Sequence, residues 1–247
     1  PNGAPADLGA DVTDVLGIKK YDPEAQQEAQ LLTKQPQKPQ SAIAHFLMRF
    51  KWYRKLFMKP KRKGGFPDWI VKTDETRIQN LTTLFEMERN KGTKFSVTEK
   101  VDGQSATYYL RKISKRKYEF GVCSRNIYLG TPDNSSYWTI AKKYNIENVL
   151  RQLIGDYETI VLQGEICGNQ IQGNKYHIRG YDLFAFNLIY PDHKCGTAEI
   201  KKLLEPYGIK TVPIVEEDKT LPETIAELVE YSKGKSVVRK EQKREGV

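Results

Sequence analysis

Hydrophobic and polar positions around residue 100 alternate in the way that is typical of a β-strand. Over residues 95–101 the two kinds of side chain fall on opposite faces, with Phe95, Val97 and Val101 against Ser96, Thr98 and Lys100. Gly103 permits a backbone turn, and we expect Gln104–Leu110 to pack back on the first strand as a hairpin. The pattern therefore predicts that Lys100 and Asp102 project together, with an amine beside a carboxylate.

The same periodicities predict further elements along the chain, where β-branched and aromatic residues mark strands and apolar residues every three or four positions mark helices. The predicted strands and extended stretches are Phe66–Val71, Tyr118–Ser124, Thr159–Ile166 and Gly180–Tyr190, with a basic turn at Ser114–Lys117. The predicted helices run from Ser41 to before Pro60, from a cap at Thr73 or Asp74 through Phe85, and over Ser135–Ile154, Thr197–Pro206 and Pro222–Ser232. This succession indicates an α+β domain built on antiparallel sheets with helices inserted between the strands.

Composition divides the chain of 247 residues into three predicted parts. Residues 1–24 hold too few apolar side chains to fold alone, and residues 25–41 are rich in Gln, Lys and Pro, which is typical of a linker. Residues 42–247 are long enough for one large domain with a sizeable core. We therefore place a domain boundary near residue 41.

The charge of the chain indicates a polyanionic partner. The formal net charge is +9 and the pI is about 9.2, and clustered Lys and Arg gain affinity by displacing counterions from phosphates. Between residues 49 and 63, basic side chains alternate with Trp52 and Tyr53, which suits contact with nucleic acid; a solvated helix face is the alternative. A membrane surface is the competing partner, but no apolar run approaches the roughly 20 residues of a spanning helix, and no signal-peptide pattern is present. We expect no membrane association.

The cysteines and histidines show no spacing that predicts a special site. The three cysteines, Cys123, Cys167 and Cys195, are odd in number and widely spaced, which fits neither a disulfide framework nor a Cys-x-x-Cys zinc site. They predict a cytoplasmic or other reducing intracellular compartment. We expect ordinary surface or packing roles for the three histidines, His45, His177 and His193.

Lys100-Val101-Asp102-Gly103 resembles the Lys-x-Asp-Gly motif of the covalent lysine nucleotidyltransferases, which include ATP-dependent polynucleotide ligases and mRNA capping guanylyltransferases. So short a motif recurs by chance, and a Lys–Asp surface pair is the alternative. The resemblance extends, in the order that the family has, through Ser124-Arg125-Asn126, Gln163-Gly164-Glu165-Ile166, Leu183-Phe184-Ala185-Phe186-Asn187 and Glu245-Gly246-Val247. The joint occurrence of these motifs favours the nucleotidyltransferase interpretation.

The closer resemblance is to ATP-dependent RNA ligases, particularly the bacterial, phage and protist group with an oligonucleotide-binding barrel before the catalytic domain. Residues 11–21 resemble the end of that barrel, and residues 66–80 also support the match. The resemblance implies a nucleotidyltransferase (ATP-grasp-like ligase) domain over residues 42–247, preceded by a remnant of a small β-barrel domain or its connector. The family has a further motif with essential lysines after the fourth one, so we expect the sequence to be truncated before it.

By this resemblance Lys100 attacks ATP and carries AMP covalently, AMP passes to an RNA 5′-phosphate, and a 3′-hydroxyl then displaces it. An ordinary lysine, with a pKa of about 10.4, is protonated at neutral pH, so burial, a nearby cation or further lysines must disfavour the ammonium form. The resemblance assigns nucleotide contacts to Glu99, Lys100, Arg125, Glu165, Phe186 and Glu245. It assigns Mg²⁺ or Mn²⁺, bound directly or through water, to Asp102, Glu165 and Glu245.

Several residues retain an ordinary alternative. Phe184 and Phe186 share one face of their strand, so one ring can stack on the base while the other packs, and the family pattern favours Phe186 for stacking. Lys72 and Arg77 are assigned to the triphosphate or the RNA 5′-phosphate, with helix-surface charges as the alternative. For Arg125 the alternative is a surface arginine, and for Glu165 it is a strand-end carboxylate.

The sequence thus predicts a monomeric RNA ligase in RNA repair, acting on RNA with 3′-hydroxyl and 5′-phosphate ends. Three alternatives remain open. A capping-type guanylyltransferase shares the fold and nucleophile, and a DNA ligase differs in features that no single residue reveals. The third is a catalytically silent RNA-binding module, favoured by the basic stretch 49–63.

Overall fold

The computed structural model describes residues 64–73 and 75–247, all of which belong to the compact unit Pro39–Val247. The predicted helix before Pro60, the basic stretch 49–63 and the predicted parts 1–24 and 25–41 lie outside the described residues, so the domain division stays a prediction. The elements in chain order are η1 (Ile78–Asn80), α4 (Thr82–Lys91), β1 (Lys94–Thr98), β2 (Gln104–Ser114), β3 (Lys117–Cys123), α5 (Ser136–Lys143), α6 (Ile146–Leu153), β4 (Thr159–Gly168), η2 (Gln172–Asn174), β5 (Tyr181–Ile189), α7 (Thr197–Leu204), η3 (Glu205–Tyr207), β6 (Lys210–Thr211), β7 (Ile214–Thr220) and α8 (Ile225–Ser232).

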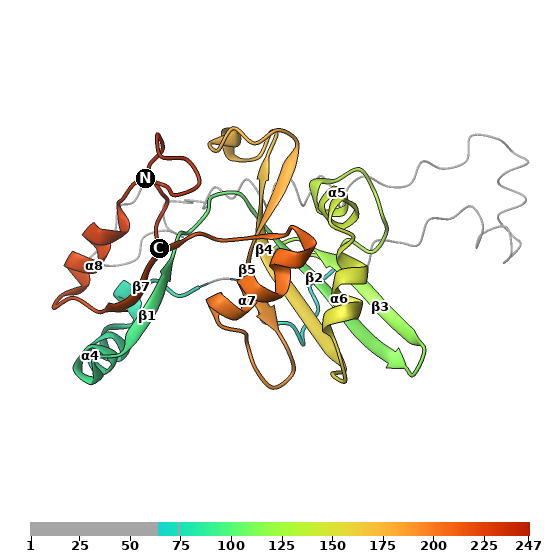
Figure 1. Cartoon of the computed structure of the whole chain (residues 1–247), viewed down its shortest axis with the longest axis horizontal. Helices are drawn as coiled ribbons and strands as arrows, with labels where there is room; N and C mark the ends of the chain where they lie inside the picture. The colour runs from blue at the N-terminus through green and yellow to red at the C-terminus, as the bar shows by residue number, and fades with distance from the viewer. Residues whose placement is uncertain (1–63, 74) are drawn as a thin grey trace, which may run out of the picture. The chain divides into compact units, whose positions relative to one another are not determined.

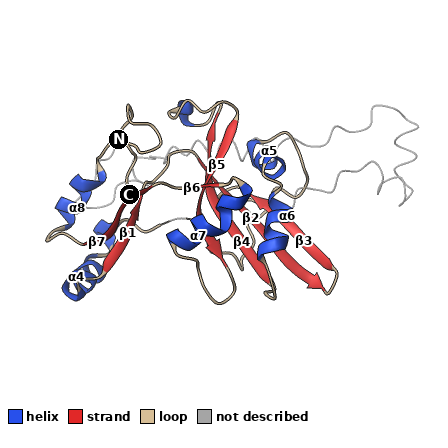
Figure 2. Cartoon of the chain, in the orientation of Figure 1, coloured by secondary structure: helices blue, strands red, loops and turns tan. Residues whose placement is uncertain are grey.

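Two sheets organise the described residues (Figure 2). The larger sheet has five strands in the order β3-β2-β4-β5-β6, with antiparallel pairs except for the parallel pair β5–β6. The smaller sheet pairs β1 with β7 in antiparallel fashion. The predicted α+β class with flanking helices is confirmed, and the one parallel pair makes the larger sheet mixed.

The predicted hairpin between residues 95–101 and 104–110 is wrong. β1 pairs with β7, with Lys94 opposite Thr220 and Thr98 opposite Ile214, whereas β2 pairs with β3 and β4. The chain therefore leaves one sheet and enters the other between Thr98 and Gln104. Local alternation predicts a strand but does not choose its partner, because any strand with the right face can fill the same edge.

Helices α5, α6 and α7 cover one face of the five-stranded sheet, and Figure 1 shows α6 and α7 in front of it. The side chains buried most completely between these layers are large and apolar, and include Tyr108, Leu110, Ile140, Ile146, Leu150, Ile160, Leu162, Leu183, Leu188 and Leu204. The single helix predicted over Ser135–Ile154 is two helices, because Asn145 adopts a left-handed backbone (φ 47°) between α5 and α6. Ser135 caps α5 by accepting a hydrogen bond from the Trp138 amide.

The segment before η1 packs on the opposite face of this sheet. Ile70 is buried in a cluster with Tyr109, Cys123 and Val161, and the Gln163 amide donates to the Val71 carbonyl at 2.7 Å. The predicted extended stretch Phe66–Val71 contains a turn, closed by the Ile70 amide on the Pro67 carbonyl. The predicted helix start at Thr73 or Asp74 is also wrong, because the first α-helix after them begins at Thr82. The Thr73 hydroxyl instead contacts that of Ser105, and Asp74 lies outside the described residues.

Within the described residues, no helix combines the length and apolarity needed to span a bilayer.

Candidate active site

Lys100, which follows β1, lies against Glu245 and Gly246. Its amide donates to the Gly246 carbonyl at 3.0 Å, which forms an isolated antiparallel bridge. Its ammonium is ion-paired with the Glu245 carboxylate, 145 residues away in sequence. The Lys100 side chain remains 59% exposed, so the amine is open to an incoming molecule. The first and last of the sequence motifs are therefore joined by both backbone and side chain.

Gly103 lies against β4 in the turn that follows Lys100. A Cβ at this position would lie 2.3 Å from the Ile166 carbonyl oxygen and 2.8 Å from the Cys167 sulfur, so no other residue fits unless the turn and β4 move apart. Its amide donates to Glu165 Oε1 at 3.1 Å. The glycine of the Lys-x-Asp-Gly motif is thus needed for close approach, and it links the first motif to the third.

Asp102 is surrounded by residues that the sequence pattern did not identify. Its carboxylate is ion-paired with Lys175, and its amide donates to the Tyr176 hydroxyl at 2.9 Å. Burial, followed by nearby Cys167 and acidic groups, raises the pKa of Tyr176, so the hydroxyl stays neutral. Both partners come from the loop between β4 and β5, which has left-handed backbone at Gln170, Gln172, Asn174 and His177. Only Asn and Gly in this stretch hinted at such turns; nothing in the spacing identifies Lys175.

Glu99 is almost fully buried, with 1% of its surface exposed. Its amide donates to the Pro213 carbonyl at 2.9 Å, and its Oε2 accepts the Val237 amide at 2.6 Å. Oε1 is also buried and has no hydrogen-bond partner within the described part of the chain. A buried acceptor without a donor is costly, so this oxygen marks a place where a ligand donor would be stabilising.

Phe184 and Phe186 have different surroundings, and the assignment of Phe186 to base stacking stays a prediction. Phe184 is buried in a cluster with Val101, Cys167, Tyr176 and Val212, while Phe186 packs against this cluster and is only partly buried. The register between β4 and β5 pairs Gln163 with Asn187 and Gly164 with Ala185, so Phe186 sits at a β-bulge. Bulges re-aim side chains, and this one leaves the Phe186 ring as the more accessible of the two.

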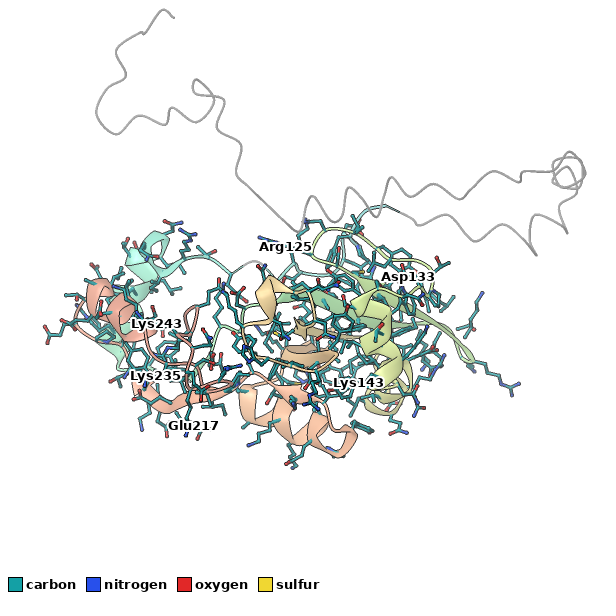
Figure 3. All side chains as sticks on the ribbon, turned by 90° about the horizontal axis from the view of Figure 1, so that it is seen from above. Arg125, Asp133, Lys143, Glu217, Lys235 and Lys243 are labelled. Carbon is teal, nitrogen blue, oxygen red and sulfur yellow. The ribbon has the colours of Figure 1, made fainter. Side chains whose placement is uncertain are left out.

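Arg125 follows β3 and is labelled in Figure 3. The turn that carries it is closed by the Ser124 amide on the Ile127 carbonyl at 3.0 Å. The neighbouring Asn126 accepts a hydrogen bond from Lys72 Nζ at 3.2 Å, so Lys72 lies beside the second motif. Arg77 precedes η1 and is exposed.

The three carboxylates predicted to bind metal are not gathered into one cluster. Asp102 pairs with Lys175, Glu245 pairs with Lys100, and Glu165 accepts from Gly103. Across residues 64–73 and 75–247, the one group of three metal-ligating atoms close together is His193, Cys195 and Glu199, elsewhere in the fold. The donor set still fits Mg²⁺ or Mn²⁺ bound largely through water, because Mg²⁺ usually keeps several waters and takes one or two carboxylates.

A cavity of about 540 Å³ lies beside these residues, at the β6 edge of the sheet. Phe184, Lys210, Pro213 and Val237 are among its lining residues, but Lys100, Asp102, Glu165 and Glu245 are not. We therefore define the candidate active site by these four charged residues, and the cavity lies next to it.

The model of the RNA ligase family matches residues 93–247. Among solved structures, a Naegleria gruberi RNA ligase mutant with ATP and Mn is 30% identical, with a TM-score of 0.67, and the match covers 98% of this chain and 62% of that one. The same ligase with PPi is 31% identical (TM-score 0.67, 97% and 61% covered), and a mutant with AMP and Mn is 30% identical (TM-score 0.68, 97% and 61% covered).

This chain thus spans about three fifths of the length of those ligases. No curated protein sequence matches it significantly. The family match covers well over half of the chain and includes every motif from Lys100 to Glu245, and the matched structures share its fold. The chain therefore belongs to the RNA ligase family.

Proposed function

We propose that this chain is the catalytic part of an ATP-dependent RNA ligase that joins RNA 3′-hydroxyl and 5′-phosphate ends through a lysyl-AMP intermediate. The family match supports the reaction class, and the matched Naegleria structures hold ATP, AMP and Mn. The observation that carries the proposal is the contact of Lys100 with Glu245 and Gly246. It brings an exposed lysine to a carboxylate that lies 145 residues later in the sequence.

Three displacements at phosphorus make up the reaction. Lys100 Nζ, after loss of a proton, forms a bond to the α-phosphorus of ATP while the bond to the bridging oxygen breaks and pyrophosphate leaves. An oxygen of the RNA 5′-phosphate then attacks the same phosphorus, and the lysine amine leaves. The RNA 3′-hydroxyl finally attacks the 5′-phosphorus, loses its proton and expels AMP.

Glu245 governs the first of these steps. Lys100 is ion-paired with the Glu245 carboxylate, and an ammonium group has no lone pair for attack. A divalent cation supplies positive charge that would draw the Glu245 carboxylate and offset charge on the transferring phosphoryl group. Asp102, Glu165 and Glu245 are the residues that would hold it. To hold the cation, Asp102 would give up part of its ion pair with Lys175.

The family resemblance assigns the nucleotide contacts, and burial supports those of Glu99 and Phe186. Glu99 Oε1, buried without a donor, is the acceptor we assign to the adenine amino group. The partly buried Phe186 ring supplies the stacking surface, and Arg125 and Glu165 reach the ribose and phosphates. Lys72, next to the second motif, and Arg77 are assigned to the triphosphate or the RNA 5′-phosphate.

The decisive experiment is transfer of labelled AMP to the protein. The full-length protein is incubated with α-labelled ATP and Mn²⁺ or Mg²⁺, and we expect one covalent AMP on the peptide that contains Lys100. Lys100→Ala should abolish the adduct, whereas Lys94→Ala, which removes the same charge from an exposed position of β1, should retain it. An undiminished adduct in Lys100→Ala would exclude the proposed nucleophile.

The same assay separates the alternatives. Preferential labelling by GTP selects a capping-type guanylyltransferase. Salt-dependent RNA binding without an adduct from either nucleotide selects a silent RNA-binding module, which the basic stretch 49–63 favours. Sealing of nicked duplexes that differ in the sugar at the 3′-hydroxyl side distinguishes RNA from DNA ligation. The buried thiols Cys123, Cys167 and Cys195 are unpaired, which supports a reducing compartment, and we propose that the enzyme acts as a monomer.

A further inference from the structure

The connection between β5 and α7 gathers three residues with different metal-ligating atoms. The His193 ring nitrogen, the Cys195 sulfur and a Glu199 carboxylate oxygen all lie within 4.8 Å of one another. Cys195 is 3% exposed, while His193 and Glu199 are open to solvent. None of them belongs to the sequence motifs of the candidate active site. The cluster therefore needs its own explanation.

The His193 ring is oriented toward the cluster. Its Nδ1 is 2.6 Å from Asp192 Oδ1, and its Nε2 is 3.9 Å from the Cys195 sulfur. Asp192 is itself held, because its other oxygen accepts a hydrogen bond from the Tyr157 hydroxyl at 3.3 Å. A carboxylate on one ring nitrogen fixes the tautomer and presents the other nitrogen as a lone pair, which is the usual arrangement behind a metal-bound histidine.

The backbone of this loop is also fixed. The Tyr190 amide donates to the His193 carbonyl at 2.8 Å, and the Cys195 amide donates to the Leu188 carbonyl at 2.9 Å. The Tyr190 ring stacks on the imidazole with a centroid distance of 4.9 Å and an interplanar angle of 18°. The backbone at His193 and Cys195 and the imidazole ring therefore keep their positions without help from an ion, which reduces the entropy cost of binding one.

Cys195 and Glu199 supply the other two ligand atoms. The Cys195 sulfur is buried and the Glu199 carboxylate is exposed, and both lie within 4.8 Å of the His193 ring nitrogen. Binding of a metal ion by the thiol would release its proton to solvent.

We infer that His193, Cys195 and Glu199 bind a zinc ion, with water in the fourth position. For tetrahedral Zn²⁺ with Zn–S about 2.3 Å and Zn–N about 2.0–2.1 Å, the sulfur and nitrogen lie about 3.6 Å apart. The observed 3.9 Å needs only a small adjustment. Nitrogen and thiolate donors select zinc over Mg²⁺ and Mn²⁺, which prefer oxygen.

This zinc site is separate from the candidate active site. The two sites lie toward different parts of β5. Phe184 pairs with Glu165 of the candidate active site, and Ile189 is at the end of β5 that leads into the zinc-binding loop. These two residues are five positions apart, which corresponds to roughly 16 Å along the strand. The ion would tie the end of β5 to the first turn of α7, because Glu199 lies in that turn. The inference does not depend on the proposed ligase activity.

Cobalt titration of the full chain tests the inference directly, because Co²⁺ enters zinc sites and a cobalt–thiolate bond absorbs in the near ultraviolet. We expect one equivalent of Co²⁺ to produce this band, and Zn²⁺ to abolish it by displacement. The oxygen ligands of the candidate active site cannot produce it, so failure here would leave the ligase proposal untouched. Absence of the band at saturating Co²⁺ would refute the zinc site and leave only a thiol hydrogen-bonded to its neighbours.

Variants identify the ligands. Cys195→Ser should abolish the band, and Glu199→Gln, at an exposed position that should not disturb folding, should weaken Co²⁺ binding more than tenfold. Glu205→Gln, an exposed glutamate just after α7, is the matched control and should bind as the parent does. Equal binding by Glu199→Gln and Glu205→Gln would overturn the assignment.

Discussion

Gly103→Ala tests whether the approach of the Lys-x-Asp-Gly turn to β4 holds the candidate active site together. The added Cβ would meet the Ile166 carbonyl oxygen at 2.3 Å, the Cys167 sulfur at 2.8 Å and the Glu165 Cγ at 3.0 Å. The carbonyl cannot withdraw easily, because β4 is hydrogen-bonded between β2 and β5 in the middle of the sheet. The turn itself must therefore move away from β4.

The magnitude follows from two contributions. Overpacking in a closely packed region costs about 1–3 kcal/mol. Loss of the 3.1 Å hydrogen bond from the Gly103 amide to Glu165 adds about 1 kcal/mol. The free energy of unfolding should therefore fall by roughly 2–4 kcal/mol, and Tm by roughly 5–15 °C for a chain of this size.

Urea and thermal unfolding measure this loss, and AMP transfer measures its effect on Lys100. Gly196→Ala is the matched control, because a Cβ at Gly196 meets nothing within 4 Å and its φ is −71°. It should cost less than about 1 kcal/mol. If Gly103→Ala is as stable as Gly196→Ala and forms the AMP adduct normally, the close contact between the turn and β4 is not required.

Three further predictions concern buried or paired charges. Asp182 is buried, which alone would raise its pKa, but hydrogen bonds from Lys210, Tyr144 and Lys143 lower the pKa overall. A lowered pKa gives stability that is present above the ordinary carboxyl pKa and is lost as the pH falls through the native pKa. In urea unfolding, Asp182→Asn should therefore cost about 2 kcal/mol at pH 7 and should flatten the loss of stability below about pH 4. Glu99→Ala leaves the Val237 amide without an acceptor and should lower the free energy of unfolding by about 2 kcal/mol. Glu99→Gln keeps an acceptor and should lose less than half as much. Equal losses in the two variants would contradict the assigned hydrogen bond. Lys175→Ala removes the half-exposed ammonium group that is paired with Asp102, and it should reduce the Mn²⁺ concentration for half-maximal AMP transfer about two- to fivefold. An unchanged Mn²⁺ concentration would show that Asp102 does not bind the metal.

Local periodicity predicted most elements of the larger sheet from the sequence. The turn at Ser114–Lys117 joins β2 to β3, and the strands predicted at Thr159–Ile166 and Gly180–Tyr190 are β4 and β5. These elements are set by the alternation of side chains and by turn residues, which are properties of neighbouring positions. The order of motifs likewise lies in the sequence, and the family match over residues 93–247 confirms the RNA ligase resemblance.

The tertiary structure decided which distant groups meet. β1 pairs with β7 and not with β2, Asp102 meets Lys175 from a loop without a recognisable pattern, and His193 faces Cys195 and Glu199 although their spacing matches no common zinc motif. The same holds for Lys100, whose predicted neighbour was Asp102 but whose partner is Glu245. A strand edge or a charged side chain is compatible with many partners, and the choice among them depends on how the whole core packs. Sequence therefore determined the chemistry that this protein carries, and only the packed fold determined which of those groups can act together.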